Sequence, residues 1–172
     1  GVSIYVRDKI SNILTVQNDL ASNSIRCIAE DEQGNYYIGT SDALSIVTIS
    51  NGLKVRKTLQ EIMYARSIAI GKAGDVAVVN NSGQLFIINN QMIKETFTLK
   101  TGNAETFYTC CKYMDNGDLL VGTTTNEMYR LRKTNGKYRT IKRYTTGNLQ
   151  QISSIASDDQ GNYWVCSGSG IG

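Results

Sequence analysis

The sequence predicts an all-β protein made of repeated four-stranded antiparallel units. The first observation is a repeat, because the stretch 31–40 returns almost letter for letter at 158–167. Two weaker copies lie between them, so that one glycine recurs every 40 to 44 residues, at Gly34, Gly74, Gly117 and Gly161. The second observation is that four short runs of apolar or alternating residues fill each period. Four strands in a period of this length are the pattern of a β-propeller blade.

The first two strands of each unit flank the recurring glycine. The run before it is rich in Ile, Cys and small residues, which predicts a strand packed on both faces, at 25–29, 65–69, 108–112 and 152–156. The run after it is mostly apolar, at 36–39, 76–79, 119–122 and 163–166. A polar connection with a central glycine joins the two runs, as a tight hairpin requires.

The third and fourth strands are predicted by alternation. Apolar and polar residues alternate at 44–49, 84–89 and 127–131, which indicates half-exposed strands. The fourth runs, 53–59, 92–99 and 138–144, carry most of the Lys and Arg. An exposed outer edge strand has this composition.

The phase of the repeat predicts how the chain divides. Residues 1–19 are expected to form the third and fourth strands of a first blade, and 148–172 the first two strands of a last one. Complete blades are expected at 20–59, 60–99 and 100–147. The whole chain is then a single propeller segment of about four blades' worth, expected to be a fragment of a larger propeller. A four-bladed ring closed by the N-terminal strands and a ring shared by two chains are the alternatives.

Composition excludes several classes of function. The 172 residues carry a net charge of only +3, so no electrostatic case for nucleic-acid binding arises. No run of about 20 apolar residues is present, so no membrane segment is expected. The four cysteines lack CxxC spacing and the chain contains no His, so no metal site is expected. Buried thiols are the expected state of the cysteines.

The same features argue against catalysis. The recurring acids lie at hairpin turns, where such side chains cap their own backbone: Asp31, Glu32, Asp115, Asp158 and Asp159. A glycosidase would need two acids converging at one place. A nucleophilic Ser or Cys would need a base, and no His is available. We therefore expect no catalytic residues, no cofactor and no enzymatic activity.

The stretch 25–46 closely resembles the two-component regulator propeller repeat, and the last copy, 152–171, resembles it as well. An Asp before the glycine, an aromatic pair after it and a Gly-Thr pair are typical of that repeat, and they match Asp31, Asp158, Tyr37, Trp164, Gly39-Thr40 and Gly122-Thr123. The middle copies depart from the pattern. Gly71 and Met114 stand in place of the Asp, and Ala77 and Leu120 in place of the large aromatic.

The resemblance implies an extracytoplasmic sensor, periplasmic or extracellular, of a bacterial membrane signalling protein of the histidine kinase or diguanylate cyclase type. Any catalytic output domain would lie outside this chain. Members of the family often respond to oligosaccharides, so a glycan or other small ligand is the implied partner, together with further blades or a second copy of the chain. A passive protein-interaction scaffold is the alternative, and a propeller lyase or glycosidase is disfavoured.

Ligands of propellers usually meet the face formed by the loops after the second strand and between blades. These loops are rich in hydroxyl and amide groups, which hydrogen-bond a polyol well. Two arginines at matching first-strand positions are further candidates for lining the central channel. The candidate ligand-binding residues are Ser41, Asp42, Asn80, Asn81, Thr124, Asn126, Arg26 and Arg66.

Overall fold

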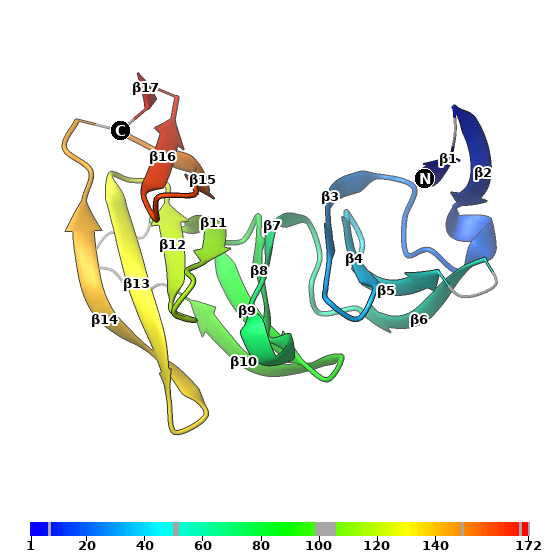
Figure 1. Cartoon of the computed structure of the whole chain (residues 1–172), viewed down its shortest axis with the longest axis horizontal. Helices are drawn as coiled ribbons and strands as arrows, with labels where there is room; N and C mark the ends of the chain where they lie inside the picture. Colours follow the sequence, from blue (N-terminus) through cyan, green and yellow to red (C-terminus); the bar gives the residue numbers. More distant parts are fainter. Residues whose placement is uncertain (7, 50–51, 99–105, 149, 169, 172) are drawn as a thin grey trace. The chain divides into compact units, whose positions relative to one another are not determined.

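The computed structural model describes residues 1–6, 8–49, 52–98, 106–148, 150–168 and 170–171. The chain divides into two compact units, Gly1–Arg66 and Ser67–Gly172. Each consists almost entirely of antiparallel strands (Figure 1). The prediction of an all-β fold built from four-stranded antiparallel blades is confirmed.

The first unit contains a hairpin and one four-stranded sheet. The hairpin pairs β1 (Val2–Val6) with β2 (Lys9–Leu14), and a short 3₁₀ helix, η1 (Val16–Asn18), follows it. The sheet has the order β3-β4-β5-β6, from β3 (Ile25–Glu30), β4 (Asn35–Thr40), β5 (Leu44–Ile49) and β6 (Leu53–Leu59). Its core joins Leu14 and Leu20 to Ile38 and Val47.

The second unit contains two four-stranded sheets and a three-stranded one. The first sheet is formed by β7 (Ala65–Ile70), whose first two residues belong to the other unit, β8 (Val76–Asn80), β9 (Gln84–Asn89) and β10 (Met92–Thr98), with the 3₁₀ helix η2 (Lys72–Gly74) between β7 and β8. The second is formed by β11 (Tyr108–Tyr113), β12 (Leu119–Thr123), β13 (Glu127–Thr134) and β14 (Lys137–Thr145). The third is formed by β15 (Ile152–Ser157), β16 (Tyr163–Ser167) and β17 (Gly170–Ile171).

The hairpins between first and second strands form where the repeated glycines predict them. Gly34 and Gly161 have positive φ values of 76° and 82°, a backbone conformation that residues with a Cβ resist. The carboxylate of Asp158 accepts the backbone N–H groups of Gln160 and Asn162. The side chain and backbone of Asn162 thereby lower the pKa of Asp158 to about 2. These contacts confirm that the recurring acid is a turn residue.

The first strands differ in burial more than their sequences predict. β11 is almost fully buried because β8 contacts it on one side and β15 on the other. β15 is mostly exposed, because the described part of its unit covers only one of its sides. The expectation of strands packed on both faces therefore holds for β11 and fails for β15. The expectation that all sheets belong to one propeller segment stays a prediction.

Residues 99–105 lie outside the described part of the chain, and they include most of one loop between expected blades.

All four cysteines are present as thiols. Cys110 and Cys111 are buried, whereas Cys27 and Cys166 are half-buried. Burial raises the pKa of the Cys27 thiol to about 11, with small opposing effects from Arg26 and the Gly39 backbone.

Candidate ligand-binding sites

Buried threonine hydroxyls shape the links between second and third strands. Thr40 Oγ1 donates to the carbonyl of Ala43 at 2.8 Å and accepts the backbone N–H groups of Asp42 and Ala43. Thr123 Oγ1 likewise donates to the carbonyl of Glu127 at 2.8 Å. Both threonines are fully buried. The Gly-Thr motif is therefore a structural element that holds the neighbouring loop residues in place.

Four of the predicted binding residues lie in the first unit. Ser41 hydrogen-bonds with Ser24 through both its backbone N–H and its hydroxyl, and its carbonyl accepts the backbone N–H of Tyr64. The exposed guanidinium of Arg26 lies 5.9 Å from the centroid of the Tyr64 ring. The structure thus brings Ser41 and Arg26 together around Tyr64. Asp42 is exposed nearby in sequence, and Arg66 is half-buried.

The other four predicted residues lie in the second unit, and two of them are engaged in holding loops. Asn80 is buried and makes two hydrogen bonds with Gln84. Asn126 donates from its side chain to the carbonyl of Gly147 at 3.0 Å. Asn81 is exposed. Whether any of the predicted residues contacts a ligand stays a prediction.

Thr124 connects the loops of two successive sheets through Phe107. Its backbone N–H donates to the carbonyl of Phe107, and its hydroxyl accepts the Phe107 N–H at 3.0 Å. The Phe107 side chain packs against Gly83 so closely that a Cβ there would lie 2.5 Å from it. The loops after β8 and after β12 therefore meet on one side of the second unit.

A depression of about 540 Å³ opens on the same side of this unit, beside the start of β15 and the end of β16. The described residues of its wall carry amide and hydroxyl groups and no charge: Gln150, Gln151, Ser153, Ser167 and Gly168. Sequence reasoning predicted the loops that carry four of these residues and the strand that carries Ser153, but selected none of them as ligand-binding. Donors and acceptors without net charge suit a polyol.

The opposite side of the second unit carries a different site, at the hairpins between first and second strands. In the outer copies of the repeat, Asp31 and Asp158 begin the turn and an asparagine follows the glycine. In the two middle copies the positions are exchanged: Gly71 and Met114 begin the turn, and the carboxylates follow the glycine as Asp75 and Asp118. Both carboxylates are buried. This exchange is visible in the sequence, and it is the signal that sequence reasoning missed.

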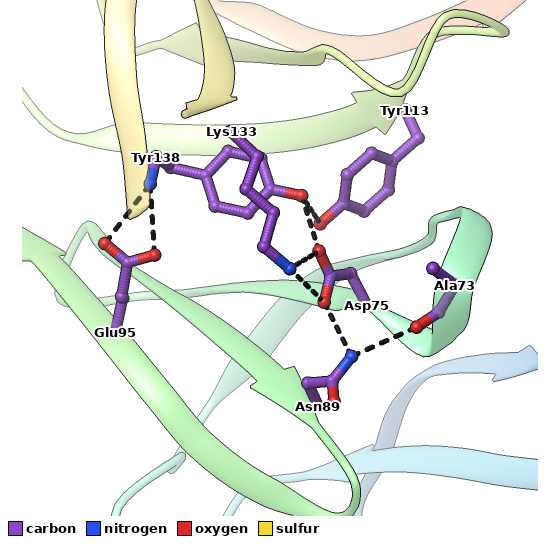
Figure 2. Close-up of polar contacts among 7 residues, drawn as sticks. All are labelled: Ala73, Asp75, Asn89, Glu95, Tyr113, Lys133 and Tyr138. Carbon is purple, nitrogen blue, oxygen red and sulfur yellow. Dashed lines mark hydrogen bonds and ion pairs between the residues drawn. The ribbon is translucent and has the colours of Figure 1, made fainter. Parts of the chain in front are cut away.

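Asp75 binds groups from two sheets (Figure 2). Lys133, in β13, contacts both of its oxygens, at 2.7 and 3.0 Å. The Tyr138 hydroxyl donates to Asp75 at 2.9 Å, and Asn89 donates to it at 2.7 Å. Because the Tyr138 proton points to Asp75, the hydroxyl of Tyr113, 3.1 Å away, donates to Tyr138. Burial raises the pKa of both tyrosines, so the chain of donors stays protonated.

Asp118 is held within its own sheet. Arg132 donates Nε and Nη2 to the two carboxylate oxygens, each at 2.9 Å, and Arg130 donates Nε at 2.6 Å. The hydrogen bonds from Arg132, followed by those from Arg130, lower the pKa of Asp118 to about 2. Asp118 is therefore ionised at any ordinary pH.

A cleft of about 310 Å³ lies between these two networks. The walls include both carboxylates, the two tyrosines and three cationic side chains, Lys72, Arg132 and Lys133. Lys72 donates its ammonium group to the carbonyl of Asp115 at 2.6 Å. The replacement of Asp by Gly71 is required here, because a Cβ at that position would lie 2.9 Å from the Tyr113 ring.

Among the described residues, no group of three or more His, Cys, Asp or Glu side chains is arranged to hold a metal ion. No helix within the same described ranges is both long and apolar enough to cross a membrane.

The repeated four-stranded sheets define a propeller-type protein. The model of the family described as two component regulator propeller matches residues 19–42, which run through β3 and β4 into the link that follows. The expected resemblance is thus confirmed for this stretch. None of the curated proteins compared with the chain shows significant sequence similarity to it.

Solved structures share the fold. The extracellular domain of BT3049 from B. thetaiotaomicron, described as a hybrid two component system, is 18% identical with a TM-score of 0.73, over 94% of this chain and 23% of that one. The extracellular domain of BT4673 from the same organism, described as a one component or hybrid two component system, is 23% identical with a TM-score of 0.70, over 95% and 23%. The WD40 β-propeller domain of Doa1 is 17% identical with a TM-score of 0.73, over 98% and 55%. The chain spans at most about half of the length of these structures, and at these identities the likeness establishes the fold alone.

Proposed function

We propose that this chain is the ligand-sensing propeller segment of an extracytoplasmic bacterial signalling receptor, of the histidine kinase or diguanylate cyclase type, and that it binds a neutral glycan without catalysing a reaction. The observation that carries the proposal is the uncharged depression beside β15 and β16, lined by amide and hydroxyl groups. Fold likeness to extracellular domains of proteins described as two component systems supports the sensory role.

The chemistry of the depression favours a sugar. Gln151 is exposed beside it, and the Ser153 hydroxyl, which donates to the carbonyl of Cys166 at 3.1 Å, keeps its acceptor capacity. Sugar hydroxyls both donate and accept, so they match amide and hydroxyl partners. A charged ligand would find no counter-charge among these five residues. Non-catalytic binding is supported by the absence of His and by the saturation of the buried carboxylates Asp75 and Asp118.

Calorimetric titration with maltotetraose, xylotetraose and mannotetraose tests the proposal. We expect saturable binding of at least one of them, weakened about tenfold by Gln151→Ala, since an unreplaced hydrogen bond in a binding site costs about 1–2 kcal/mol. Gln160→Ala is the matched control, because Gln160 is an exposed glutamine at the other end of β15. It should leave the affinity unchanged.

Failure of every tetrasaccharide to bind would contradict glycan sensing and favour the protein-interaction scaffold. Equal effects of the two glutamine substitutions would contradict the assignment of the depression as the site.

A further inference from the structure

The cleft between the hairpins of the second unit has more positive than negative charge in its walls. Lys72, Arg132 and Lys133 face two carboxylates, Asp75 and Asp118 (Figure 2 shows the Asp75 side). The cleft is separate from the uncharged depression beside β15 and β16, because it lies at the opposite end of the strands. Its charged lining calls for a different ligand.

The carboxylates are already satisfied by the protein. Asp75 accepts from Lys133, Tyr138 and Asn89, and Asp118 accepts from Arg130 and Arg132. Neither is available to attract a further cation, since its lone pairs are directed at these donors. A metal ion or an amine therefore has no carboxylate left to bind.

The cations, in contrast, keep donors that face outward. Lys72 forms no ion pair with any residue that the structure describes. Its ammonium group donates one hydrogen bond, to the carbonyl of Asp115. Arg132 holds Asp118 through Nε and Nη2, while its Nη1 makes no hydrogen bond within the described ranges. The Arg132 side chain is 51% exposed. These exposed donors can bind an acceptor that a ligand brings.

Size restricts the ligand. A cleft of about 310 Å³ is at the small end of ligand sites, which typically run from about 300 to 1,000 Å³. The rings of Tyr113 and Tyr138, 6.4 Å apart in an edge-to-face arrangement, form its apolar wall. An anionic group beside Lys72 and Arg132 with a small body against this wall fits the lining.

We propose that the cleft is a second binding site, for a small oxyanion-bearing ligand no larger than a monosaccharide, held through a carboxylate or a phosphate group by Lys72 and Arg132. Arg132 provides planar donors that match either group, and Lys72 provides a point charge. Asp75 and Asp118 orient the surrounding cations and do not contact the ligand.

Titration calorimetry of the whole chain with glucuronate, inorganic phosphate and neutral glucose tests the site. We expect at least one anion to bind, more weakly as salt rises, and Lys72→Ala to weaken it about tenfold through loss of one charge-assisted hydrogen bond. If only glucuronate binds, the site takes a carboxylate ligand. If only phosphate binds, it takes a phosphate ligand. Binding of both identifies a general oxyanion site. Arg132→Lys, which keeps a cation for Asp118 but removes the planar donors, should also weaken binding.

Lys54→Ala is the matched control, because Lys54 is exposed on β6 and is not part of the cleft. It should bind the anion like the unmodified chain, and circular dichroism should show the same strand content in all variants. Lack of binding by both anions, or an unchanged affinity in both cleft variants, would overturn the proposal. Binding of neutral tetrasaccharides should be unaffected by Lys72→Ala, so failure of one site is distinguishable from failure of the other.

Discussion

At the scale of single residues, the position of one carboxylate distinguishes two kinds of hairpin. A carboxylate at the start of the turn, as in Asp158, binds groups of its own hairpin, namely the backbone N–H groups of Gln160 and Asn162 and the indole N–H of Trp164, which donates to it at 3.0 Å. A carboxylate after the glycine, as in Asp75, is buried and binds a lysine 58 residues away in the sequence. In the hairpin of Asp75, moving the acid by four positions thus places it at the centre of a network between sheets, whereas in the hairpin of Asp118 the network stays within one sheet.

Substituting Asp118 by Asn should lower the free energy of unfolding near neutral pH by about 1–3 kcal/mol, because it removes the charge and one acceptor oxygen from the buried group that Arg130 and Arg132 bind. The folded pKa of about 2 lies below the ordinary value of 3.8, so folding stabilises the ionised form. This contribution is present above the ordinary pKa and is lost as pH falls from about 5 toward about 2.

Urea denaturation of the unmodified chain and of Asp118→Asn across this range measures the difference. The two stabilities should converge toward the acidic end. Asp115→Asn is the control, since the Asp115 side chain is exposed in the same hairpin. A difference that stays constant with pH would contradict the ion-pair explanation.

At the scale of elements, close approach of strands requires glycine in the second strand of a sheet. Gly122, in β12, lies so near to β15 and β11 that a Cβ there would be 2.6 Å from Ile152 Cγ2 and 2.8 Å from Cys110 Sγ. Gly39 is in the same situation against Ala65 and Cys27. Within the second unit, Gly122 therefore sets the distance between the sheet of β12 and the sheet of β15.

Gly122→Ala should lower the free energy of unfolding by about 1–3 kcal/mol, since the added methyl group overpacks the contact with Ile152. The urea midpoint measures the change. Gly168→Ala is the matched control, because no atom of the described residues lies within 4 Å of a Cβ built at Gly168. Equal midpoints for the two variants would show that the sheets are not packed as described.

The strands and hairpins could be predicted because their signals are local. Positive φ at Gly34 and alternation in β6 depend on a few neighbouring residues. Burial of the first strands could not be predicted in the same way. β11 and β15 are both six-residue strands with apolar and small residues, yet of the two only β11 has a described sheet on each side. Asn80 was predicted to lie in the loop after the second strand, whereas it is the last residue of β8. The sequence also does not show that its side-chain amide hydrogen-bonds with Gln84 through both the oxygen and the nitrogen.

At the scale of the whole chain, the repeats share their strands and differ in what they carry at the strand ends. The uncharged depression and the cleft lined by Lys72, Arg132 and Lys133 both lie where one copy of the repeat departs from another. The cleft could be recognised only after folding, because Lys133 and Asp75 come from different sheets. The two proposals together place two binding chemistries on one repeat scaffold.

Hydrogen–deuterium exchange with and without the tetrasaccharide that gives the largest calorimetric heat tests the glycan-sensing proposal most directly. Sugar bound in the depression should slow exchange at residues 150–153 and 166–168, and it should leave the hairpins at 31–35 and 158–162 unchanged. Slower exchange confined to the hairpins, or no change along the chain despite saturating sugar, would contradict it.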